Sequence, residues 1–186
     1  MIGALPTTLE ISGKQYAIRS DFRVVLSIFE AFEDPAFSGR EKIIVTLRSL
    51  YIDIIPREYI SEAFEKAVWF MDGGDIPKTK KAKEKVFDWK YDESILFPAV
   101  NKVAGYETRS CRYLHWWSFI GMFNEIGEGL FSTVMNIRNK RAEGKKMDKW
   151  EVEFYNSHKN MINIQTAADK AEIEETEAFL KELLGE

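Results

Sequence analysis

Apolar residues recur every three or four positions along most of the chain, the spacing that places side chains on one face of an α-helix. Three such stretches occupy residues 22–34, 38–55 and 57–72. The second begins with Ser38 followed by Glu41, a capping-box pattern typical of a helix N-terminus. We therefore expect three amphipathic helices in the first half of the chain.

One stretch near the N-terminus follows a different pattern. In TLEISGKQYAIRS, residues 8–20, apolar and polar residues alternate on both sides of Ser12-Gly13. Alternation around such a turn predicts a short β-hairpin, and no other part of the sequence carries a comparable strand signal.

The second half returns to the helical spacing after an interruption. The interruption is GGDIPKTKKAKEK, residues 73–85, whose glycines, proline and lysines predict an exposed basic linker. Pro98 lies inside the next helical stretch and should kink or shorten that helix. The expected fold class is mainly α, a bundle of six to seven helices with a small N-terminal β-hairpin. A single domain should cover residues 1–165, followed by an acidic helical tail at 166–186.

The composition is typical of one soluble domain. The chain has 186 residues, 45% of them hydrophobic, which is enough for a sizeable core. Its 26 Lys and Arg are balanced by 30 Asp and Glu, so the molecule as a whole is no evident binder of polyanions. The sequence has a single cysteine, Cys111, no secretory signal pattern, and no apolar run near the roughly 18 residues of a membrane span. We therefore expect a soluble, cytosolic protein that does not contact membranes.

The stretch YLHWWSFIGMFNEIG, residues 113–127, could line a catalytic pocket or form the centre of a core. Its helical wheel is apolar over most of the circumference, which favours a buried helix with Trp116 and Phe123 among the most buried side chains. His115 is then a packed histidine with one hydrogen-bonded nitrogen. Cys111 lies one helical turn before His115, but a working Cys-His pair normally draws its histidine from elsewhere in the fold.

Motifs for metals, nucleotides and activated nucleophiles are absent from the sequence. The two histidines lie 43 positions apart, and neither HExxH nor CxxC occurs. The GxSxG elbow and the glycine-rich phosphate loops are also missing. We expect no enzymatic activity, no cofactor and no metal requirement.

Two groups of basic residues leave nucleic-acid binding open as an alternative function. They are Lys78, Lys80, Lys81, Lys83 and Lys85 in the linker, and Arg138, Lys140, Arg141, Lys145 and Lys146 near Gly144. The simpler interpretation is a solvated loop and a solvated helix end, where cations also suit the helix dipole.

The last 21 residues, 166–186, differ in character from the rest of the chain. They hold seven acidic side chains against two lysines, a net charge of −5. Apolar bulk occurs only near the end, at Phe179, Leu180, Leu183 and Leu184. Either this segment packs on its own bundle, or it docks with these four anchors on a neighbouring copy or a partner protein. In the second case the patch around Arg138 and Arg141 attracts the acidic segment.

Three segments of the second half resemble the bacteriophage gene-product-fifteen family. They are FDWKYDESILFPAVNKVAGYETRSCRYLHWWSFIGMF, VMNIRNKR and FYNSHKNM, and YLHWWSF carries most of the similarity. The resemblance is clearest over residues 86–160, is weaker in the hairpin and the first three helices, and runs out in the tail. It departs from the family pattern at Pro98.

The resemblance implies a role in phage tail assembly. Genes of this family lie among the tail genes of phages and prophages of Gram-positive bacteria, just ahead of the tape-measure gene. This position implies a tail-assembly chaperone, or a related morphogenesis factor, in the cytoplasm of the bacterial host. The implied partners are the tape-measure protein or tail-tube subunits, with self-association between copies as a further expectation. The family brings no catalytic residues.

Overall fold

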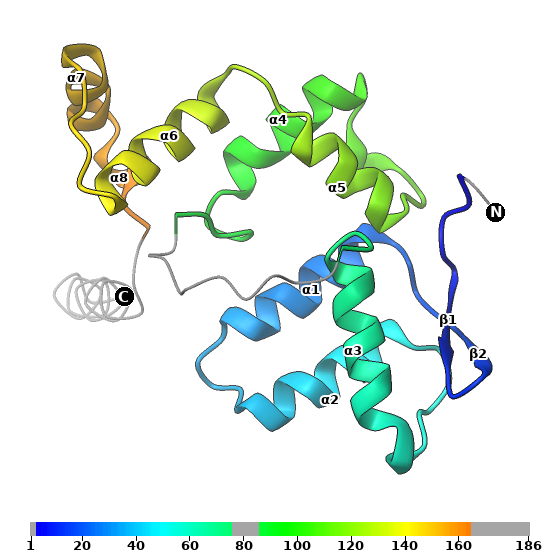
Figure 1. Ribbon diagram of the computed structural model, residues 1–186. Helices are drawn as coiled ribbons and strands as arrows, with labels where there is room; N and C mark the ends of the chain where they lie inside the picture. The colour runs from blue at the N-terminus through cyan, green and yellow to red at the C-terminus, as the bar shows by residue number, and fades with distance from the viewer. Residues whose placement is uncertain (1–2, 76–85, 165–186) are drawn as a thin grey trace, which may run out of the picture.

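Helices make up most of the protein, whose computed structural model describes residues 3–75 and 86–164 (Figure 1). The described ranges contain the α-helices α1 (Phe22–Glu33), α2 (Gly39–Leu50), α3 (Ile60–Met71), α4 (Glu93–Ala104), α5 (Trp116–Asn124), α6 (Leu130–Ala142), α7 (Lys149–Ser157) and α8 (Lys159–Ile162). Two single 3₁₀ turns, η1 (Arg57–Tyr59) and η2 (Thr108–Ser110), precede α3 and α5. The predicted mainly α fold with an N-terminal hairpin is confirmed, and the short α8 adds one helix to the expected range.

The N-terminal hairpin has the turn that its sequence predicts. Strands β1 (Thr8–Ile11) and β2 (Lys14–Ala17) pair antiparallel. Ser12 and Gly13 connect them, with φ angles of 48° and 77°. Two consecutive positive φ angles are typical of a type I′ turn, whose twist matches that of the paired strands.

Side-chain caps fix the starts of three helices where the sequence indicates them. Asp21 accepts a backbone N–H in the first turn of α1. Capping boxes open α2, through Ser38 and Glu41, and α7, through Asp148 and Glu151. Each cap satisfies backbone donors that have no partner within the helix.

Pro98 does not shorten its helix. Helix α4 runs from Glu93 to Ala104 and contains Pro98 at its sixth position, on the exposed side. The missing N–H therefore removes a single bond, to the carbonyl of Ser94 near the helix start. The rest of α4 packs normally, with Leu96 and Val100 fully buried.

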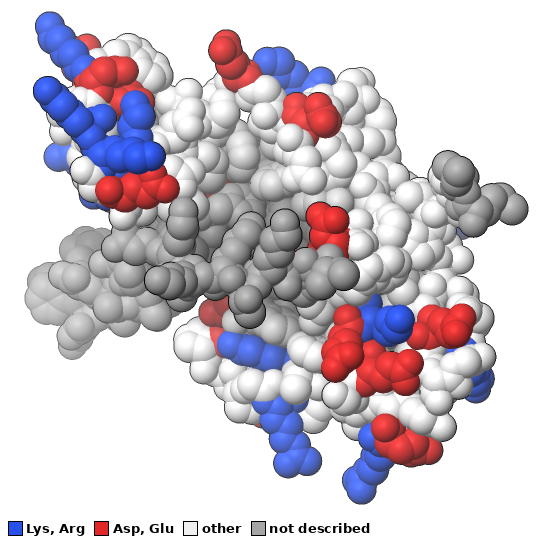
Figure 2. All heavy atoms as spheres, viewed as in Figure 1, with Lys and Arg blue, Asp and Glu red and all other residues white. Residues whose placement is uncertain are grey.

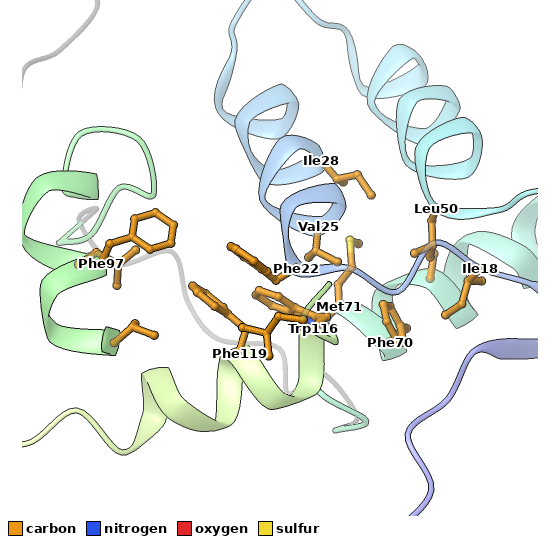
Figure 3. Packing of buried hydrophobic residues seen from close by; sticks show 14 of the residues in the cluster. Ile18, Phe22, Val25, Ile28, Leu50, Phe70, Met71, Phe97, Trp116 and Phe119 are labelled. Atoms are coloured by element: carbon orange, nitrogen blue, oxygen red, sulfur yellow. The ribbon is translucent and has the colours of Figure 1, made fainter. Parts of the chain in front are cut away.

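The hydrophobic core lies where α1, α3, α4 and α5 meet (Figure 3). Phe22 stacks on Phe119 with ring centres 4.5 Å apart, and Phe97 meets Phe119 at 5.9 Å. Trp116 lies beside them with 1% of its surface exposed, which confirms its predicted place in the core. The matching prediction for Phe123 is wrong: it is only half-buried, because it lies in the last turn of α5.

The C-terminal helices extend away from this core. Helix α6 packs on α4, and α7 and α8 lie at its far end, away from the hairpin (Figure 1). None of the helices in the described ranges is long and apolar enough to cross a membrane.

Candidate protein-binding surfaces

His115 is a structural cap. Its Nδ1 accepts the backbone N–H of Trp117 at 3.0 Å, which makes it the N-cap of α5. Because Nδ1 accepts, the neutral ring donates from Nε2, and it does so to the carbonyl of Pro6 at 2.9 Å. The predicted packed histidine is confirmed, but both nitrogens are bonded, and the residue precedes the helix. Neither nitrogen is left for Cys111, whose Sγ lies 3.9 Å from the carbonyl oxygen of Glu107.

The two tryptophans join α5 to the end of α3. The indole of Trp116 donates to the carbonyl of Met71 at 2.8 Å, and that of Trp117 donates to the carbonyl of Phe70 at 2.9 Å. These carbonyls belong to the last turn of α3, where helix carbonyls lack the usual partner four residues on. That of Phe70 also accepts the backbone N–H of Gly73 at 3.2 Å. Gly74 then passes so close to Trp117 that an added Cβ would lie 2.9 Å from its ring. The YLHWW sequence is therefore a junction of the fold.

No candidate metal site occurs in the described ranges. They contain no group of three or more His, Cys, Asp or Glu side chains placed to hold a metal ion.

Arg138 corrects the expectation of a solvated helix end. Its side chain is only 5% exposed, and its guanidinium forms two 2.7 Å hydrogen bonds to the carboxylate of Asp92. It also donates to the backbone carbonyls of Val86, Met161 and Ile162. No local pattern could indicate this pairing, because Asp92 lies 46 positions away. The guanidinium of Arg138 is therefore not available at the surface to bind a partner.

The remaining cations of this patch are largely paired within the chain. Lys140 binds Glu151 at 2.5 Å, and Lys145 binds Glu143 at 2.7 Å. Figure 2 accordingly shows blue and red atoms intermixed over α6 and α7, at its upper left. Such pairing weakens the attraction for nucleic acid that the sequence left open. The lysines of the linker at residues 78–85 lie outside the described residues.

Arg141 remains on the surface, as the sequence predicts. Its guanidinium bonds the side-chain oxygen of Asn163 at 2.5 Å and lies 4.4 Å from the ring centre of Tyr155 in α7. These contacts hold the end of the described chain against α7.

Helix α7 and its C-cap carry an aromatic stripe, exposed at both ends and half-buried in the middle, that the sequence had not led us to predict. Trp150, Phe154 and His158 follow one another at four-residue spacing. Their ring centres are 5.5 Å and 4.3 Å apart, and Trp150 is 57% exposed. The spacing itself was a readable signal for a shared helix face.

A second exposed apolar feature is a groove between α4 and the connection from α5 to α6, with a volume of about 390 Å³. Its apolar lining comprises Ile95, Pro98, Ala99, Val103, Ile126, Leu130 and Phe131. Lys102, Glu125 and Glu128 also line it. Its residues come from two distant stretches, so no local pattern in the sequence could indicate it. Such a groove can take the apolar face of an amphipathic helix.

The predicted anchors Phe179, Leu180, Leu183 and Leu184 lie outside the described residues, as does the whole acidic tail at 166–186.

Residues 1–164 match the sequence model of a family described as Bacteriophage Gp15 protein. The chain belongs to this family. The match includes the hairpin and α1 to α3, where the motifs alone indicated the resemblance more weakly, and it stops just before the acidic tail. No curated protein and no solved structure matches the chain. Family membership makes this a phage-associated protein.

Proposed function

We propose that this Gp15 family member is a non-enzymatic tail-morphogenesis protein of a phage or prophage. In this role it is a tail-assembly chaperone that holds the tape-measure protein or tail-tube subunits in the host cytoplasm before assembly. Family membership supports the phage context. The observation that carries the binding role is the groove beside α4, which presents apolar side chains at the surface.

The groove suits a helical segment of the partner. Val103 and Leu130 are 39% and 45% exposed, although both are apolar. An amphipathic helix places side chains from successive turns in such a groove and removes this apolar surface from water. The amine of Lys102 donates to the carbonyl of Glu128 at 3.2 Å, so the groove has a fixed polar edge that can orient the bound helix. A tape-measure protein, as a very long helical chain, offers many such segments.

The experiment is co-expression of the full chain with the products of its flanking genes, followed by co-purification. We expect a tail protein, the tape-measure or tail-tube product, to co-purify. The variant Val103→Glu/Leu130→Glu places two charges in the groove and should abolish the complex while the melting temperature stays near that of the wild type. Ile54→Glu is the matched control, because Ile54 is 94% exposed and lies outside the groove.

Two results would contradict the proposal at different levels. If no flanking product co-purifies with the wild type, the chaperone role fails. If the complex survives the groove variant, the role stands but the binding site lies elsewhere.

Nucleic-acid binding is the second candidate function, and one observation favours it. Lys149 and Trp150 are consecutive exposed residues, and the exposed Lys146 lines the same hollow as Lys149, an arrangement that can contact phosphates and stack on a base. DNA binding that weakens steeply with salt, and is lost in Trp150→Ala, would support this alternative over the chaperone role.

A further inference from the structure

Helix α7 turns two of its large apolar residues, Trp150 and Val152, outward, whereas Phe154 and Tyr155 are half-buried against the core. Its only buried residue is Glu151, which pairs with Lys140, whereas Trp150 is 57% exposed and Val152 is 39% exposed. An amphipathic helix normally does the reverse. In Figure 1 α7 lies at the far end of α6, apart from the hairpin and α1 to α3. This helix therefore has the exposed side chains of an interface.

The surroundings of α7 favour an acidic occupant. Lys146 and Lys149 line a hollow of about 780 Å³ beside the helix, together with Met147, Val152 and Lys140, whose amine is paired with Glu151. Asp148 and Glu153 also border it, but the carboxylate of Asp148 is engaged in the helix cap. Figure 2 shows lysine and arginine atoms at this end of the molecule, intermixed with those of aspartate and glutamate. A ligand that combines negative charge with apolar anchors fits both properties of the surface.

The chain itself contains a segment with this chemistry. Residues 166–186 have a net charge of −5, and their apolar side chains Phe179 and Leu183 are four positions apart, as helix anchors should be. The family match ends at residue 164, just before this segment begins.

The position at which the described chain ends favours docking of segment 166–186 on another copy. Arg141 contacts both Asn163 and Tyr155, so the segment starts beside its own α7. Phe179 lies 15 positions after Ile164, about 22 Å along a helix. Helix α7 spans only about 14 Å at the same rise per residue. Residues 167–178 are mostly good helix formers, so as a helix this stretch would be longer than α7.

We propose that the acidic segment 166–186 of one copy docks on the α7 surface of a second copy, with Trp150 packing against Phe179 and Leu183. The exchange is reciprocal, so two copies form a symmetric dimer with two identical contacts. This interaction is separate from the groove of α4 and does not depend on the chaperone role.

The test uses the full chain in analytical ultracentrifugation over a range of concentrations. The wild type should be dimeric, and both Trp150→Glu and Phe179→Glu/Leu183→Glu should be monomeric at the same concentration with an unchanged melting temperature. Ile54→Glu, an equally charged change at a 94% exposed residue, should remain dimeric. Raising the salt concentration should weaken the wild-type dimer, because opposite charges contribute to it.

Mixing the two interface variants separates this exchange from other modes of association. The Trp150→Glu copy keeps an intact segment, and the Phe179→Glu/Leu183→Glu copy keeps an intact α7. An equimolar mixture should therefore form heterodimers through one of the two contacts, more weakly than the wild type. A monomeric wild type, a dimer that survives either variant, or a mixture that stays monomeric would each overturn the proposal.

Discussion

The hydroxyl of Tyr51 shows how one buried polar group links two helices. Tyr51 follows α2, is almost fully buried, and donates to the carbonyl of Ala63 in α3 at 2.8 Å. Burial raises the pKa of this phenol well above its usual value, and the charge of Glu62 raises the pKa further. The neutral phenol is therefore the form that the folded state favours.

This raised pKa predicts a loss of stability in alkali. The contribution of Tyr51 is complete below the unfolded pKa of about 10 and declines as the pH rises above it. Tyr51→Phe should cost about 1 kcal/mol at pH 7, because the carbonyl of Ala63 loses its donor. The stability difference between wild type and variant should shrink from pH 10 upward in urea unfolding measured at each pH. Curves that stay parallel through that range would contradict the assignment.

Trp116 is the residue whose truncation should be most informative. Its indole contacts the rings of Phe29, Trp89 and Phe119 and donates to the carbonyl of Met71. Trp116→Ala should lower the free energy of unfolding by about 3–5 kcal/mol, because it leaves a cavity and an unpaired carbonyl. The matched control is Trp150→Ala, at an exposed tryptophan, which should cost far less. Equal melting temperatures for wild type and Trp116→Ala would show that the core lies elsewhere.

At the scale of elements, the sequence predicts the features that depend on interactions between neighbouring residues. The hairpin turn and the caps at Asp21, Ser38 and Asp148 depend on residues within four positions of each other, and all were predictable. The start of α5 was not. The wheel placed His115 inside the helix, whereas its Nδ1 caps the helix through the N–H of Trp117 and its backbone pairs with that of Asp21. That pairing joins residues far apart in the sequence, and helical periodicity carries no information about it.

The two candidate surfaces also differ in how far the sequence could predict them. The groove brings α4 together with the α5–α6 connection, so only the fold reveals it. The stripe of Trp150, Phe154 and His158 was visible as a spacing, but spacing alone cannot show which face of a helix is exposed. From the sequence alone, Arg138 was expected at a solvated helix end. Its partner Asp92 lies 46 positions away, at the start of α4, so no local pattern indicated the pairing.

At the scale of the whole molecule, Arg138 connects three separate parts of the chain. From α6 it reaches Asp92 at the start of α4, Val86 at the edge of a described range, and the carbonyls of Met161 and Ile162 in α8. A buried ion pair gains little net stability over apolar residues, but the loss of one partner leaves an uncompensated charge. We therefore expect the pair to favour one arrangement of α4, α6 and α8.

A double-mutant cycle tests this role. Asp92→Asn leaves the guanidinium of Arg138 without its counter-charge, and Arg138→Met leaves a buried carboxylate, so each change should cost about 3–5 kcal/mol in urea unfolding. The double variant removes both charges, and the side-chain amide oxygen introduced by Asp92→Asn can still accept the backbone N–H of Asp88 that Asp92 accepts at 3.0 Å. Its cost should therefore fall below the sum of the single costs by about 0.5–3 kcal/mol. Some loss should persist, because the carbonyls of Val86 and Ile162 lose the guanidinium donor in both variants that contain Arg138→Met. Additive single costs would mean that the backbone carbonyls hold Arg138 in place and that its charge pairing with Asp92 contributes nothing to the assembly of these helices.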